Sequence, residues 1–159
     1  MAIEVFQIEW TKPQPLDKAL TQSAAQEGGI YAIGLINANG TKLQYVGKTK
    51  EFYGRSSTHM NYASHLNTKT QLKKYFIAFG LISCFDKSRM SHDITPEQLK
   101  DVESFFINFY KPEGNSPATK KGYRGHPIIV FNTGKKVFKL KTLTNCPDLV
   151  KLLKTSLAR

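Results

Sequence analysis

Cysteine is scarce in this sequence of 159 residues, which contains only Cys84 and Cys146. Two cysteines cannot form a disulfide framework or a cysteine-rich zinc site. Long apolar runs are also missing, since the longest, residues 75–79, falls far short of the roughly 18 residues that a membrane span needs. Charged residues such as Glu4 and Glu9 leave no apolar signal-peptide region. These absences argue against a secreted mini-protein, a zinc finger and a membrane protein, and they favour a reducing, cytoplasmic setting.

Acidic residues are nearly missing from the C-terminal part of the chain. Residues 114–159 hold 10 basic residues and one acidic residue, Asp148, whereas residues 1–113 hold 13 basic and 11 acidic residues. The whole chain has a formal net charge of +11. A basic segment of this kind attracts polyanions, and nucleic acid is the commonest such partner. A solvated, solubilising surface is the alternative, and charge alone does not decide between the two.

Length and hydrophobic content place the chain among ordinary globular proteins. A mass of 17.9 kDa and 40% hydrophobic residues are enough for one domain with a core, so we expect residues 1–159 to form a single domain. The Asn39-Gly40 pair predicts a tight turn, because both residues tolerate positive φ. It predicts a β-hairpin over residues 28–47. The other elements expected in the first half are a strand at 3–10, a helix at 15–26, helices at 53–66 and 69–79, and a strand at 81–85.

A strong helix start stands in the second half of the chain. Thr95 can cap, Pro96 suits the first turn, and Gln98 completes a capping box, so a helix is predicted from 95 to about 110. The elements expected after it are a basic loop at 115–127, strands at 128–132 and 137–143, and a helix at 147–157. Strands and helices mixed without regular alternation predict the α+β class.

Several residues have side chains suited to chemistry. Glu103 lies on a mostly apolar stripe of the predicted helix, where a carboxylate is costly unless it is paired or bound to a metal. Arg55 and His59 are four residues apart, so a helix would present them on one face, where they could bind a phosphate and move a proton. Taken singly, Glu103 also fits a salt bridge to a nearby lysine or arginine. Arg55 and His59 also fit a solvent-facing polar pair. Tyr31, Tyr45 and Lys48, on or just after the hairpin, are undistinguished alone.

The set is more specific than its members. In chain order it comprises Gly29-Ile30-Tyr31, Tyr45-Val46-Gly47-Lys48-Thr49, Arg55-x-x-x-His59, Glu103 and Lys111-Pro112-x-x-Asn115. Over residues 28–115 the sequence resembles the GIY-YIG nuclease superfamily, with Val46 standing where the second motif has Ile. Residues 1–27, an N-terminal addition, and 116–159, a basic C-terminal extension, lie outside the resemblance.

The resemblance implies a core built on a three-stranded antiparallel sheet flanked by helices. The N-terminal strand and helix, and the C-terminal β-hairpin and helix, would then be additions to this core. It also implies hydrolysis of phosphodiester bonds in DNA with one divalent metal ion. On that pattern Glu103 is the metal ligand, and Tyr31 is the general base or orients the attacking water. The remaining catalytic residues would be Tyr45, Lys48, Arg55, His59 and Asn115.

Ligand number and side-chain pKa bear on the metal and on the base. Two-metal nucleases need several carboxylates, whereas these motifs supply only Glu103, so one Mg²⁺ or Mn²⁺ held largely by water and phosphate fits better. A tyrosine has a pKa of about 10, so Tyr31 would need nearby cations to act as a base, or it would relay a proton instead. The residues expected to contact DNA phosphates are Lys120, Lys121, Arg124, Lys135, Lys136, Lys139 and Lys141.

The sequence therefore predicts a metal-dependent endonuclease acting on DNA, expected to be duplex, and restriction-like if it is site-specific. The alternatives are a structure-selective repair nuclease and a nucleic-acid-binding protein that has the fold but does not cut. A single active site cuts one strand per event, so cleavage of both strands would need a homodimer or sequential nicking. A restriction role would imply a companion methyltransferase.

Overall fold

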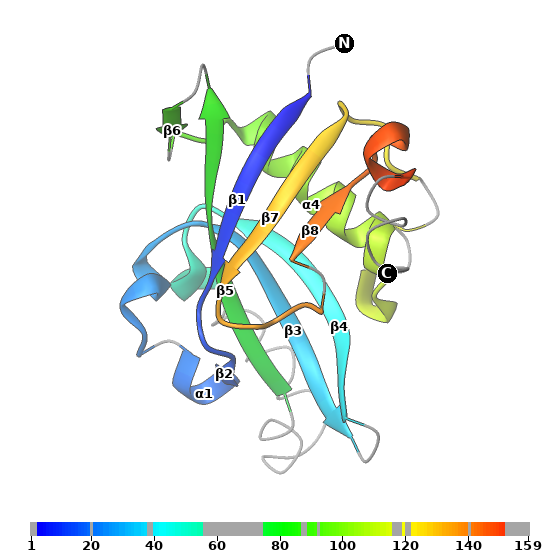
Figure 1. The fold of residues 1–159 in the computed structure, drawn as a ribbon. Coiled ribbons are helices and arrows are strands. Elements are labelled where there is room, and N and C mark those ends of the chain that lie inside the picture. Colours follow the sequence, from blue (N-terminus) through cyan, green and yellow to red (C-terminus); the bar gives the residue numbers. More distant parts are fainter. Residues whose placement is uncertain are drawn as a thin grey trace.

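The computed structural model describes residues 3–19, 21–37, 40–55, 75–86, 89–91, 93–115, 119, 122–139 and 141–151. Figure 1 shows strands gathered into a sheet with the long helix α4 lying across it. The strands are β1 (Glu4–Trp10), β2 (Gln14–Pro15), β3 (Gly29–Asn37), β4 (Gly40–Thr49), β5 (Tyr75–Asp86), β6 (Arg89–Ser91), β7 (Ile128–Gly134) and β8 (Thr142–Thr144). The helices are α1 (Leu16–Ala19), η1 (Ser23–Gln26), α4 (Pro96–Tyr110) and η2 (Glu113–Asn115), with helical residues also at 52–55 and 147–151. The α+β class is confirmed.

The sheet is larger and more mixed than the expected three-stranded antiparallel core. Its main path runs β4-β3-β5-β1-β7-β8, and β2 and β6 both pair with β5. Strands β4, β3 and β5 are antiparallel, but β5 continues into an antiparallel pair with β1, and β1 pairs in parallel with β7. The expected N-terminal and C-terminal additions therefore supply strands to the same sheet as the hairpin.

The predicted hairpin is confirmed. Strands β3 and β4 pair from Gly29 opposite Thr49 to Asn37 opposite Gly40, with an irregularity between Ile33 and Gly34. Of the Asn39-Gly40 pair that predicted the turn, Asn39 lies outside the described residues and Gly40 is the first residue of β4.

The helix predicted at 69–79 is wrong over residues 75–79, which form the first part of β5. Residues 69–74 lie outside the described part of the chain. β5 lies in the interior of the sheet, so Ile77 and Phe79 are buried on one face and Ala78 on the other. A strand covered on both faces reads as a continuous apolar run, without the alternation that marks a half-buried strand. The third strand beside the hairpin thus begins at Tyr75, not Leu81.

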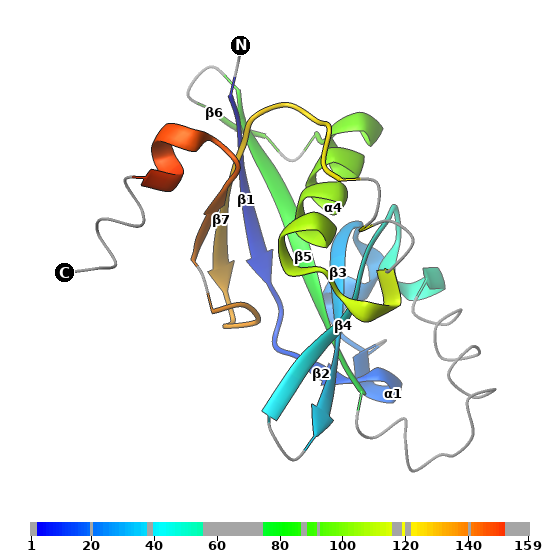
Figure 2. The ribbon, with the colours of Figure 1, turned by 90° about the vertical axis from the view of Figure 1, so that its right-hand side faces the viewer.

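Two cores lie on opposite faces of the sheet. On one face, α4 packs against residues of β1, β5 and β7, including Phe6, Ile8 and Val130. On the other face, a smaller cluster joins Tyr31, Phe79 and the buried Phe52 with alanines of α1 and η1. Figure 2, turned by 90°, shows α4 on one side of the sheet. The hairpin is therefore covered from both sides.

Helix α4 begins as predicted. The Thr95 hydroxyl accepts a hydrogen bond from the Gln98 backbone N–H, and the Gln98 side chain accepts one from the Thr95 N–H, so the capping box is complete. The helix ends at Tyr110, and Lys111 follows in the left-handed conformation with φ of 48°. This regular segment carries Glu103 to the hairpin.

Other boundaries differ from the prediction. Residues 15–26 form two short helical turns in place of one helix, and the strand predicted at 137–143 is reduced to β8. Phe138 explains the second difference, because its ring is buried against Trp10, Phe106 and Tyr110. That burial draws 135–139 into a loop over the end of the sheet. Of the helix predicted at 147–157, residues 147–151 are helical and 152–157 lie outside the description.

No helix in the described part of the chain has both the length and the apolar character needed to cross a membrane.

Candidate active site

Two tyrosines of the hairpin form the floor of the candidate site. Tyr31 of β3 is almost fully buried, at 1% exposure, and its ring stacks on Tyr45 of β4 with centroids 5.9 Å apart. Gly47 lies directly opposite Tyr31 in the strand register. A Cβ at Gly47 would overlap the Tyr31 phenol and lie 2.8 Å from Cε1 of Tyr45. The missing side chain at 47 therefore makes room for both rings.

Arg55 reaches the Tyr31 hydroxyl from the helical turn after β4. That turn is anchored by Phe52, which is fully buried, stacks on Phe79 at 4.5 Å and donates its backbone N–H to the Glu27 carbonyl. Arg55 itself is exposed, and its Nε donates a hydrogen bond of 3.2 Å to Oη of Tyr31. An exposed guanidinium fixed at one end by a buried phenol can contact an anion in solvent with its remaining donors.

Glu103 approaches the same end of the hairpin from α4. Its Oε1 accepts a hydrogen bond of 3.0 Å from the backbone N–H of Lys48, just beyond the Tyr45-Val46-Gly47 motif. The carboxylate is half-buried, and the positive charges of Lys48 and Arg55 are close enough to act on it. One carboxylate, one guanidinium and one ammonium are thus gathered at this place.

Asn115 fastens the chain after α4 to the hairpin. Its Oδ1 accepts from the Val46 N–H and its Nδ2 donates to the Val46 carbonyl, both at 2.8 Å, and the side chain is buried. The neighbouring Gly114 allows this close approach, because a Cβ there would lie 2.7 Å from the Gln44 carbonyl oxygen. An exposed ion pair between Lys42 and Glu113 adds a further link. Asn115 thus holds β4 in place and does not present a free polar group to a substrate.

Burial controls the protonation of Tyr31. Desolvation raises the pKa of the Tyr31 hydroxyl well above its ordinary 10.0, and the hydrogen bond from Arg55 lowers that pKa by less than burial raises it. Tyr31 is therefore a neutral phenol near pH 7. The nearby cation is present as the base hypothesis requires, but in this geometry it does not generate a phenolate.

Burial also acts on Glu103. Desolvation raises the pKa of its carboxyl above the ordinary 4.5, against the opposing attraction of Lys48, the Lys48 N–H and Arg55. A half-buried carboxylate of this kind gains from a second positive partner. Within the described residues no cluster of three or more His, Cys, Asp or Glu side chains is found. A carboxylate oxygen such as that of Glu103 is a ligand that a hard cation such as Mg²⁺ accepts, and water and substrate would supply the remaining ligands.

The structure brings five of the predicted catalytic residues to one end of the hairpin: Tyr31, Tyr45, Lys48, Arg55 and Glu103. Asn115 is adjacent but buried in its contact with Val46. His59 lies outside the described residues. The supporting residues Gly47 and Phe52 were not singled out for these roles from the sequence. The hairpin register could have indicated Gly47, whereas the burial of Phe52 depends on the tertiary fold.

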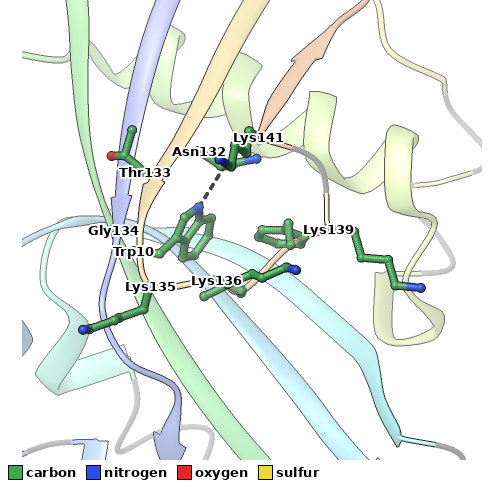
Figure 3. Close-up of a pocket in the computed structure, with 10 residues that line it drawn as sticks. Trp10, Asn132, Thr133, Gly134, Lys135, Lys136, Lys139 and Lys141 are labelled. Atoms are coloured by element: carbon green, nitrogen blue, oxygen red, sulfur yellow. Dashed lines mark hydrogen bonds between the residues drawn. The ribbon is translucent and has the colours of Figure 1, made fainter. Parts of the chain in front are cut away.

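Four of the predicted DNA-binding lysines surround a small cavity of about 180 Å³ at the end of β7 (Figure 3). They are Lys135, Lys136, Lys139 and Lys141. The wall is formed by Trp10 and Phe138, and the indole Nε1 of Trp10 donates to Asn132. In Figure 3, Lys135 and Lys139 extend to opposite sides and away from the indole. The group is thus a spread basic surface and not a converging pocket for one phosphate.

The remaining predicted DNA contacts are less uniform. Arg124 lines a shallow cleft with Glu97, Asp101 and Lys100, so acidic groups offset its charge. Lys120 and Lys121 lie outside the described residues.

Comparison with known proteins identifies no relative of this chain. No protein-family model, no curated protein and no solved structure matches the chain. The resemblance to the GIY-YIG superfamily therefore rests on the motifs of this sequence.

Proposed function

We propose that the protein is a divalent-metal-dependent endonuclease of the GIY-YIG type that hydrolyses phosphodiester bonds in DNA. One observation carries the proposal: the hairpin, the turn at 52–55 and α4 each bring a motif residue to the same place. The contacts are Arg55 to Tyr31 and Glu103 to the backbone of Lys48. A buried phenol, an exposed guanidinium and a desolvated carboxylate have no evident common structural purpose, because each incurs a desolvation or entropy cost.

Each side chain has a role that its surroundings support. Arg55 binds a phosphate oxygen and offsets the negative charge that grows on the phosphorus in the transition state. Lys48 adds positive charge beside Glu103. Glu103 would hold Mg²⁺, which when bound supplies Lewis-acid stabilisation of a phosphate oxygen. Tyr45 stacks on Tyr31 and keeps its ring in place.

Tyr31 serves best as a neutral group that orients water and passes a proton on. Its raised pKa opposes a resting phenolate, but a phenol hydroxyl both donates and accepts. We expect Tyr31→Phe to lower the cleavage rate by about 10²–10⁴-fold while duplex affinity stays unchanged. Single-turnover cleavage and a fluorescence binding titration measure the two, with Tyr53→Phe, an exposed tyrosine in the neighbouring turn, as the control. Cleavage at the normal rate by Tyr31→Phe would remove Tyr31 from the mechanism.

Supercoiled plasmid is the direct test of the whole proposal. Wild type, Glu103→Gln and the control Glu97→Gln, an exposed carboxylate at the start of the same helix, are incubated with Mg²⁺ or with EDTA. We expect wild type and Glu97→Gln to cut in Mg²⁺ only, and Glu103→Gln not to cut in either condition. Cleavage by Glu103→Gln, or cleavage in EDTA, would contradict the proposed site.

The products separate the versions of the proposal. Discrete fragments with fixed ends would indicate a site-specific, restriction-like enzyme, whereas cutting restricted to branched or damaged substrates would indicate a structure-selective repair nuclease. A wild type that binds DNA and cuts neither plasmid nor branched substrates would point to a binding protein with the nuclease fold.

A further inference from the structure

A wider cavity lies over the hairpin at the place where α4 ends. Its volume is about 730 Å³, which is within the range of roughly 300–1,000 Å³ that ligand pockets have. Its floor includes Ala32 and Gly34 of β3 and Ala78 of β5, and Tyr110, the last residue of α4, also lines it. Ala32 and Ala78 are direct cross-strand partners on the α4 side of the sheet. Because the floor side chains are small or missing, a hollow remains beyond the end of the helix. We name it the α4-end cavity.

The walls of the α4-end cavity suit a flat apolar group. Gly34 pairs with Leu43 on one side and with Phe76 on the other, so two large side chains flank a position that has none. Both of these side chains line the cavity. Phe76 is half-buried and belongs to neither of the two cores. An aromatic ring placed in this way can stack on a flat ligand.

Tyr110 supplies a polar group. Its ring stacks on that of Phe138, which also lines the cavity, with centroids 4.6 Å apart. Its hydroxyl oxygen is buried and has no hydrogen-bond partner in the described part of the chain. Burial raises the pKa of this hydroxyl to about 12, so it stays a neutral donor. A buried hydroxyl without a partner is costly, and an acceptor on a ligand would remove that cost.

Every charged residue that lines the cavity in the described part of the chain is a lysine. Lys12 follows β1, whereas Lys136 and Lys139 belong to the loop between β7 and β8, and all three are exposed. Figure 1 shows this loop, in orange, turning from the end of β7 towards β3. The ligand is therefore an anion with a flat apolar body. A fatty acid has a single anionic group, but cations from two separate segments match a strand with a phosphate on each side of a base.

We propose that the α4-end cavity binds one unpaired nucleotide of a DNA strand. The base lies over Gly34 between Phe76 and Leu43, and the flanking phosphates contact Lys12 and the lysines of the loop. Because apolar and aromatic walls stack on any base, the cavity recognises that a nucleotide is unpaired and not which base it carries.

The inference rests on the proposed function for its DNA partner, and it names a class of substrate for that function. Tyr110 follows Glu103 by seven residues, which is about 10 Å along α4, or about three nucleotide steps of roughly 3.4 Å. A strand with one nucleotide in the cavity can therefore reach the carboxylate. Bulged and mismatched duplexes are the favoured substrates, because their unpaired bases cost least to extrude.

Fluorescence anisotropy in EDTA, where no cleavage takes place, tests the cavity separately from catalysis. The probes are a short duplex with one bulged nucleotide and a fully paired duplex with the same flanking sequence. We expect wild type to bind the bulged duplex about tenfold more tightly than the paired one. Phe76→Ala should lose this preference, because the stacking surface is gone, and should bind the paired duplex as wild type does. Phe85→Ala is the matched control, since it alters an exposed phenylalanine of the same strand that does not line the cavity.

A lysine variant provides a second test that removes no apolar group. Lys12→Gln should weaken binding of the bulged duplex more than binding of the paired one, because Lys12 contacts a phosphate only when the strand enters the cavity. Lys18→Gln, which alters an exposed lysine on α1 outside the cavity, should keep the full preference. Circular dichroism establishes that each variant is folded.

Equal affinity of wild type for the two duplexes would overturn the inference. A preference that survives both Phe76→Ala and Lys12→Gln, or that disappears in Phe85→Ala, would also overturn it. A preference for the bulged duplex without cleavage of any substrate would retain the cavity and reject the proposed function. Cleavage that depends on Mg²⁺ and Glu103, together with equal binding of the two duplexes, would do the reverse.

Discussion

At the residue scale, the site depends on what is missing as much as on what is present. Gly47 has no side chain, and the Tyr31 phenol occupies the space that a Cβ would take. The paired strand register, and not catalysis, thus accounts for a glycine at this position. The Tyr31 ring in turn fixes one end of the Arg55 side chain.

We expect Gly47→Ala to displace both tyrosine rings, abolish cleavage and destabilise the fold by about 1–3 kcal/mol through overpacking. Plasmid cleavage and urea unfolding measure the two effects. Gly54→Ala is the matched control, because the nearest atom to a Cβ there, Oε2 of Glu51, lies at an ordinary 3.7 Å. Unchanged stability and activity in Gly47→Ala would show that the rings do not need this space.

Glu103 connects protonation to stability. Its pKa is raised in the folded chain by burial, so the neutral form is favoured in the folded state and the ionised form is disfavoured. The stability that the neutral carboxyl contributes is present below its ordinary pKa of 4.5 and is lost as pH rises through the raised value. We therefore expect Glu103→Gln, in EDTA, to have a higher Tm than wild type at pH 7.5 and a similar Tm at pH 4. A lower Tm for the variant at pH 7.5 would contradict this sign.

At the element scale, the hairpin and α4 are joined by contacts that end at β4. Glu103 contacts the backbone after the motif, and Asn115 pairs with both backbone groups of Val46. The predicted capping box starts α4 at a fixed residue, which sets where Glu103 stands along the helix. The helix start was therefore predictable from local residues. The residue that Glu103 would meet was not, because it depends on how α4 packs against β4.

Asn115 is the residue whose loss should loosen this junction. Asn115→Ala leaves the buried N–H and C=O of Val46 without their partner, which we expect to destabilise the fold by about 2–4 kcal/mol. Urea unfolding measures the effect, and Asn145→Ala, which removes a single bond to the Ile128 N–H, provides a milder comparison. A smaller loss in Asn115→Ala than in Asn145→Ala would show that the junction is held elsewhere.

At the scale of the whole molecule, exposed lysines gather at the end of the sheet where β7 ends. The lysines of the 135–141 loop lie around the cavity whose wall includes Trp10 and Phe138. Phe138 holds the loop against Tyr110, seven residues after Glu103 on α4, so the basic surface lies about 10 Å along the helix from the carboxylate. A duplex bound at the site could thus contact both.

Salt dependence measures this contribution. Each lost phosphate contact lowers the slope of log affinity against log salt by about 0.9, so Lys135→Ala with Lys139→Ala should flatten the slope by about 1.8. Lys18→Ala, an exposed lysine on α1, is the control and should leave the slope unchanged. Fluorescence anisotropy with a short duplex gives the slopes. An unchanged slope in the double variant would assign the loop to solubility.

The sequence by itself determined the features that depend on neighbours along the chain. The Asn39-Gly40 signal and the Thr95–Gln98 capping box are local, and the hairpin and the start of α4 follow them. The side chains suited to phosphate chemistry could also be identified from the sequence motifs. Only the tertiary structure decided that residues 75–79 are a strand. Both faces of this strand are buried, so its sequence lacks the alternation of apolar and polar residues that would indicate a strand. It alone decided the parallel pairing of β1 with β7 and the contact of Arg55 with Tyr31, because each joins residues far apart in the chain through packing that no local pattern records.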